Sequence, residues 1–269
     1  MLHKVSVDVA FTNAPVALVM MEVRHPAADS VTESSSGELK RLLVDDLPVE
    51  RQAQDVGWGI GAGGSPTPTA ERFVRYVNRD NTLAASMKTQ AVVVETTEYS
   101  DFEALVDVVM RVMDARSRVS SIIGVERIGL RYVLEVRSPT GGDGRIEWAD
   151  SIAKPLLGPQ HTAPAGMTLT EWQGAAVYRE AQPGKSLIVR YGPGMGQALD
   201  PSYHLRRTIA VQPGPFFLLD IDSFWNPTGS IPEYNWDAVQ ATFQDLHTPA
   251  QTAFEEMLTN GLKDDLPTR

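Results

Sequence analysis

The sequence predicts an α+β protein in which long helices lie on one face of an antiparallel sheet, arranged as two similar halves. Short stretches of β-branched and other apolar residues recur along the chain at the lengths of strands. Two longer segments repeat their apolar residues at helical spacing. The order of these elements also recurs, because residues 217–224 have the character of residues 92–99 and a long helical segment follows each stretch.

The first half contains two helix signals. Ser35 and Glu38 have the spacing of a capping box and predict a short helix, and Ser100 and Glu103 repeat that spacing ahead of the most regular helical pattern. Glycine and proline are frequent at 57–69, which we therefore expect to be a loop. The predicted strands, spaced as in an antiparallel meander, are 16–23, 73–76, 83–87 and 91–95.

Residues 127–137 alternate in polarity and predict a half-exposed strand, with Arg131 and Glu135 on its polar face. The sequence SPTGGDGR at 138–145 has little to bury and predicts a linker. It separates 1–138 from 146–269, either as two domains or as halves of one continuous domain. The second half is predicted to hold helices at 147–157 and 236–260, the latter kinked at Pro249, and strands at 174–180, 187–191, 205–211 and 216–224.

Composition narrows the class of protein. The 269 residues include 24 lysines and arginines against 34 aspartates and glutamates, so the net charge is −10. The absence of a basic block argues against nucleic-acid binding. The absence of cysteine excludes disulfides and thiolate chemistry.

The sequence has neither a signal-peptide pattern nor an apolar run of membrane-spanning length, so we expect a cytoplasmic protein without a membrane partner. Homo-oligomerisation stays open.

No recognisable catalytic motif is present, which favours a non-enzymatic protein that binds another protein. Trp58 and Trp225 lie next to predicted loops, and tryptophan is enriched at the centres of interfaces. Arg131 and Arg190 lie on predicted strands and add charged donors. These four residues are the predicted binding residues, and this hypothesis needs no cofactor.

An alternative hypothesis is a metal-dependent enzyme that binds phosphate esters or nucleotides. Asp220 and Asp222 lie two residues apart on a predicted strand, so both carboxylates share one face and could hold Mg²⁺. Arg131 or Arg190 would then bind the phosphate. If the sheet closed into a barrel, its charged strand faces would line a polar tunnel.

Several phrases, in order along the chain, resemble a sporadically distributed family of uncharacterised bacterial proteins of about this length. They are residues 13–16, 22–24, 127–133, 219–224, 246–247 and 254–259. The resemblance implies an architecture and a scattered distribution that is typical of mobile elements, phage defence and toxin–antitoxin systems. It implies no catalytic residues.

Overall fold

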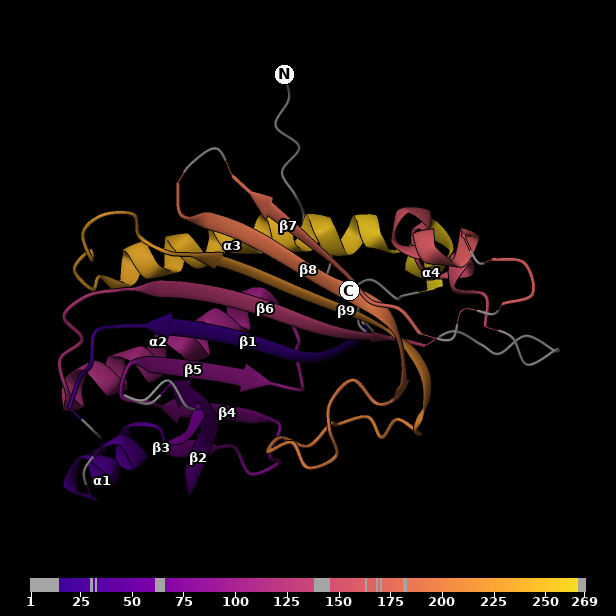
Figure 1. Cartoon of the computed structure of the whole chain (residues 1–269). Coiled ribbons are helices and arrows are strands. Elements are labelled where there is room, and N and C mark those ends of the chain that lie inside the picture. Colours follow the sequence, from indigo (N-terminus) through magenta and orange to yellow (C-terminus); the bar gives the residue numbers. More distant parts are fainter. Residues whose placement is uncertain are drawn as a thin grey trace.

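The computed structural model describes residues 15–265, except 30, 32, 61–65, 138–145, 163, 168, 170, 181 and 182. These residues form nine strands: β1 Val16–Arg24, β2 Val49–Ile60, β3 Pro66–Val77, β4 Leu83–Met87, β5 Ala91–Thr96, β6 Arg127–Val136, β7 Gly174–Arg179, β8 Lys185–Gly196 and β9 Gly214–Trp225. All pair antiparallel in one sheet, in the order β2-β3-β4-β5-β1-β6-β9-β8-β7 (Figure 1). The predicted α+β class with an antiparallel sheet is therefore confirmed.

β1 lies in the middle of the sheet and pairs with β5 on one side and β6 on the other. Strands from before and after residues 138–145 therefore share one sheet, and the predicted linker itself lies outside the described residues. The sheet ends in β2 and β7, so it is open among the described residues and does not form the barrel that a polar tunnel would require.

Three helices pack against one side of the sheet, which we call the helix side: α1 Glu33–Leu42, α2 Phe102–Val119 and α3 Trp236–Met257. Figure 1 views the sheet from its other side, the open side, with α2 behind β1 and β5. The 22-residue α3 continues through Pro249 as one helix. A short helix, α4 Asn260–Asp265, follows it. The core joins alternate residues of the strands, such as Met21, Val94, Leu130 and Phe217, with the apolar stripes of these helices.

Asp101, not Ser100, caps α2, because its side chain accepts a hydrogen bond from the amide of Ala104. The predicted capping box is therefore wrong by one residue. The predicted helix at 147–157 is also wrong. Two 3₁₀ helices, Trp148–Asp150 and Lys154–His161, take its place, and the missing amide of Pro155 explains why no continuous α-helix forms.

The predicted loop at 57–69 is wrong at both ends, because residues 57–60 belong to β2 and residues 66–69 belong to β3. β2 and β3 pair continuously from Val49 opposite Val77 to Ile60 opposite Pro66. β4 pairs only with residues 74–77 of β3, so the part of β3 that carries Pro66 and Pro68 has β2 as its single partner strand. A proline amide is tolerated on such an unpaired edge.

Residues 205–211 do not form the predicted strand. They belong to the long connection between β8 and β9, residues 197–213, which crosses the open side of the sheet. None of the helices in the described residues has the length and apolar character that a membrane crossing requires.

Candidate functional site

Charged side chains concentrate on the open side of the sheet. The strand alternation that directs Met21 and Leu130 into the core directs their neighbours, such as Glu22 and Arg131, to this side. Three of its carboxylates belong to buried residues, namely Glu95, Glu135 and Asp220. A buried carboxylate is costly unless it is paired, so each of them identifies a set of fixed partners.

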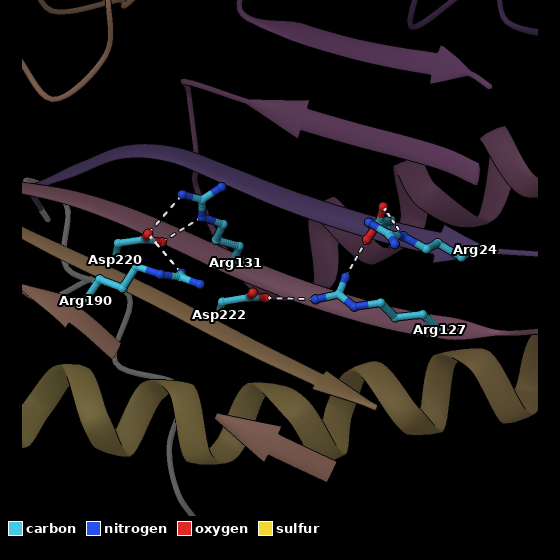
Figure 2. A network of polar contacts seen from close by, with 7 residues as sticks. Arg24, Arg127, Arg131, Arg190, Asp220 and Asp222 are labelled. Atoms are coloured by element: carbon cyan, nitrogen blue, oxygen red, sulfur yellow. Dashed lines mark hydrogen bonds and ion pairs between the residues drawn. The ribbon is translucent and has the colours of Figure 1, made fainter. Parts of the chain in front are cut away.

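Asp220 lies between two arginines from neighbouring strands (Figure 2). Arg131 on β6 donates from Nε to Oδ1 at 2.6 Å and from Nη2 to Oδ2 at 2.9 Å. Arg190 on β8 donates to Oδ2 at 3.3 Å. The Asp220 side chain is 6% exposed, whereas those of Arg131 and Arg190 are 40% and 47% exposed. The hydrogen bonds that Arg131 donates to Asp220 raise the pKa of Arg131 above its usual value, so its charge is permanent.

A second group of charges adjoins this one. Arg127 on β6 donates to Glu22 and, at 3.2 Å, to Asp222, and Arg24 donates to Glu22 at 2.8 Å (Figure 2). Gly129 lies between Arg127 and Arg131 on the same strand face, and a Cβ there would collide with the Arg127 guanidinium. The missing side chain therefore lets Arg127 lie flat on the sheet. We call the combined set the arginine face: Glu22, Arg24, Arg127, Arg131, Arg190, Asp220 and Asp222.

Residues 197–213 cover a different part of the open side. Tyr203 donates from Oη to Glu95 at 2.5 Å, and His204 Nε2 lies 3.0 Å from the same carboxylate. The amide of Ala198 and the guanidinium of Arg207 each donate to Glu135 at 2.7 Å. Apolar side chains fill the space beneath the segment, among them Leu18, Val133, Leu199 and Leu205.

The charge of Glu95 follows from these contacts. Burial acts to raise the pKa of Glu95, but the hydrogen bond and charge of His204, with Tyr203 and Arg75, outweigh burial and hold that pKa below its usual value. Burial raises the pKa of the Tyr203 hydroxyl, and the neighbouring Glu95 charge raises it further. Glu95 is therefore the ionised acceptor and Tyr203 the neutral donor.

A pocket of about 180 Å³ lies at the end of the arginine face. Arg190 and Asp220 line it together with Gly192, Gly194 and Phe216. A Cβ on Gly194 would lie 2.6 Å from the Phe216 ring, so glycine is required for the ring to pack there. The pocket is smaller than the roughly 300 to 1,000 Å³ of ordinary small-molecule sites, and its size suits one polar side chain or a small anion.

The structure brings together four of the six candidate residues, namely Arg131, Arg190, Asp220 and Asp222. The two aspartates share one side of the sheet, as their spacing predicts, but guanidinium groups contact both oxygens of Asp220 and one oxygen of Asp222. Among the residues that the structure describes, no cluster of three or more histidine, aspartate or glutamate side chains is arranged to hold a metal ion.

The two candidate tryptophans lie elsewhere. Trp225 is the last residue of β9, and it packs against the core from the helix side, opposite Arg131 and Arg190. Trp58 pairs with Pro68 in the β2–β3 hairpin, and its side chain lies outside the described part of the chain.

Sequence reasoning did not select Arg127 and Gly129. Both occupy odd positions of the alternating strand that contains Arg131, so alternation alone places them on its polar face. It also did not select Tyr203 and His204, and no local pattern links them to Glu95, which is more than 100 residues away in the sequence.

The described residues form an α+β protein with one open antiparallel sheet, and ion-paired arginines lie on the part of its open side that residues 197–213 leave exposed. No protein-family model and no curated protein matches the chain.

Proposed function

We propose that this protein is a non-enzymatic binding protein whose arginine face receives an acidic segment of another protein. One observation carries the proposal: Arg24, Arg131 and Arg190 are 55%, 40% and 47% exposed, yet less exposed carboxylates hold all three in place. Arg131 and Arg190 share the single charge of Asp220, so their ion pairs with this acid leave part of their positive charge for a partner.

Fixed guanidinium groups suit this task. An arginine has five N–H donors, and Arg131 directs two of them to Asp220, which leaves donors for a partner's carboxylates. Because the ion pairs already order these side chains, binding loses less side-chain entropy than it would with free arginines. Across the arginine face four arginines meet three carboxylates, so it carries a net charge of +1 in a chain whose net charge is −10.

We also infer that the sheet contains a duplicated unit, whose second copy begins with β6, ahead of residues 138–145, and the strand registers support this. Residues 21–24 (MEVR) resemble residues 134–137 (LEVR). Met21 of β1 pairs with Val94 of β5, as Leu134 of β6 pairs with Leu219 of β9, so one copy of the unit contains β1 and β5 and the other contains β6 and β9. The same offsets make Glu95 correspond to Asp220 and Glu22 to Glu135.

This correspondence supports the arginine face as a docking surface. Residues 197–213 pack over Glu95 and Glu135. The counterparts of these two acids, Asp220 and Glu22, both belong to the arginine face, where the half-exposed arginines show that no described segment packs over them in the same way. Two acids of the arginine face thus correspond to two acids that a chain segment covers elsewhere on the open side.

The resemblance to sporadically distributed bacterial proteins extends the proposal to a cytoplasmic accessory factor of a mobile-element, phage-defence or toxin–antitoxin system. The metal-dependent phosphate-ester enzyme is less favoured, because Mg²⁺ would have to displace the guanidinium groups that contact Asp220 and Asp222.

The test is affinity capture from cells of the source organism with the tagged full chain and two double variants. Arg24→Gln with Arg190→Gln removes two exposed charges from the arginine face while Arg127 and Arg131 still pair with the acids. Arg41→Gln with Arg118→Gln is the matched control, because it removes two exposed charges from α1 and α2.

We expect one protein to be captured stoichiometrically by the wild type and the control, and to be lost with the arginine-face variant. The captured protein should contain an acidic segment, and its binding should weaken as salt is raised. Equal capture by both variants, or recovery of the chain alone, would refute the proposal. A rise in melting temperature with Mg²⁺ and a nucleotide, abolished by Asp220→Ala, would instead support the enzyme.

A further inference from the structure

A second surface that the described residues leave uncovered lies on the helix side, at the β7 edge of the sheet. It is a groove of about 790 Å³ between β7, β8, the second half of α3 and the 3₁₀ helix Lys154–His161. The apolar side chains that line it include Leu156, Tyr178, Leu187, Ala253 and Met257. Tyr178 is 53% exposed, although its strand neighbour Ala176 pairs with the fully buried Val189.

The two ends of the helix side differ in how they are covered. One row of paired residues crosses the sheet from β3 to β7, namely Tyr76, Ala85, Val94, Met21, Leu130, Ser223, Leu187 and Tyr178. At the β3 end, α1 covers Tyr76, which is fully buried and donates from its hydroxyl to the carbonyl of Ser36 at 3.0 Å. At the β7 end, the exposure of Tyr178 shows that no described helix covers it in this way.

The polar groups of the groove are mainly acidic. Glu180, Asp245 and Glu256 line it with a single lysine, Lys185, which lies 2.8 Å from Asp245 and 3.9 Å from Glu180. Three acids against one base leave a net charge of −2 at the groove. Pro249 also lines the groove and has no amide hydrogen, so the carbonyl of Asp245 lacks the helical hydrogen bond that another residue would donate. This carbonyl is one more acceptor beside two carboxylates.

We propose that this groove binds an amphipathic helix of a partner protein, one that carries lysine or arginine next to its apolar stripe. The apolar stripe would pack on Tyr178, Leu187 and Ala253, as α1 packs on Tyr76 at the other end of the sheet. The basic residues would pair with Asp245 and Glu256. The groove lies on the opposite side of the sheet from the arginine face, so this proposal does not depend on the proposed function.

The test uses the full chain and a fluorescent peptide with leucines at helical spacing and lysines at the remaining positions. A peptide with glutamate in place of each lysine is the charge control. Thr252→Trp inserts a large ring into the groove at an exposed position, and Thr242→Trp, on α3 outside the groove lining, is its control. Asp245→Asn with Glu256→Gln removes two of the three acids of the groove, and Asp107→Asn with Asp114→Asn makes the same change of net charge on α2.

We expect the lysine peptide to bind the wild type and both controls equally. Loss of the Asp245 and Glu256 charges should weaken binding about tenfold, and Thr252→Trp should abolish it. Hydrogen exchange should slow in β7 and in α3 when the peptide is added. Equal binding of the glutamate peptide, equal weakening by both charge variants, or binding that survives Thr252→Trp would refute the proposal. A dimer of the chain that Thr252→Trp dissociates would show that a second copy is the occupant, and would refute it too.

Discussion

Glu95 is the buried acid whose contacts make stability depend on pH. His204, Tyr203 and Arg75 hold its pKa below the usual value in the folded state. A carboxyl with a lowered pKa stabilises the folded state fully above its unfolded pKa, about 4.3 for glutamate. That stabilisation is lost as the pH falls through the lower, folded pKa.

We therefore expect Glu95→Gln to lower the free energy of unfolding at pH 7 and to flatten its decline on acidification. Urea unfolding of both proteins between neutral pH and about pH 3 measures this. Glu38→Gln, which changes an exposed residue of α1, is the control and should retain the wild-type decline. Parallel pH curves for Glu95→Gln and the wild type would contradict the assignment.

The side on which a candidate residue lies was predictable, but its partners were not. The spacing of Asp220 and Asp222 places both on one side of β9 whatever the rest of the fold does. Their partners depend on strand order, because Arg131 is 89 residues and Arg190 is 30 residues from Asp220 along the chain. Only the placement of β9 between β6 and β8 brings these three side chains together.

The connection between β8 and β9 is held on the sheet by both polar and apolar contacts. Leu205 is 4% exposed and packs with Leu18 and Val133, whereas Ile209 on the same connection is 69% exposed. We expect Leu205→Ala to lower the free energy of unfolding by about 3 kcal/mol and Ile209→Ala by less than about 0.5 kcal/mol. Hydrogen exchange in residues 197–213 should quicken only in the first variant. Equal effects of the two substitutions would show that the connection does not rest on this apolar cluster.

Elements were predictable where periodicity and pairing agree. The predicted strand at 83–87 coincides with β4, and the long helical patterns coincide with α2 and α3 to within a few residues. Residues 205–211 are rich in apolar residues, as strands are, but β8 and β9, which this segment connects, each have a partner strand on both sides. The glycines and prolines of 57–69 suggest a loop locally, and pairing along the β2–β3 hairpin overrides that preference.

The repeated order of elements predicts two similar halves, but it could not decide between two cores and one. That choice depends on β6 and β9, which lie on either side of residues 138–145 in the sequence and pair with each other rather than each ending a separate sheet. The core on the helix side joins Met21 and Val94 from the first half with Phe217 and Phe243 from the second. Breaking either half would therefore expose apolar surface of the other.

This arrangement makes cooperative unfolding the expectation for the whole chain, and the tryptophans allow a test. Four of the five, Trp148, Trp172, Trp225 and Trp236, lie in the second half, so their fluorescence reports mainly on that half. Met21 lies in the first half and is 1% exposed. We expect Met21→Ala to lower the free energy of unfolding by about 3 kcal/mol. Because the core is shared, the urea midpoint measured by tryptophan fluorescence should fall together with the midpoint measured by far-ultraviolet circular dichroism. The dependence of the free energy of unfolding on urea concentration should stay unchanged.

Two independent cores would give the opposite result. The tryptophan transition would then keep its midpoint in Met21→Ala, and circular dichroism would separate into two steps. Val119→Ala, at the end of α2, is a matched control for the first half, because Val119 is only partly buried against the core. Its effect should have the same sign in both signals and be smaller, since a partly buried side chain loses less contact on truncation.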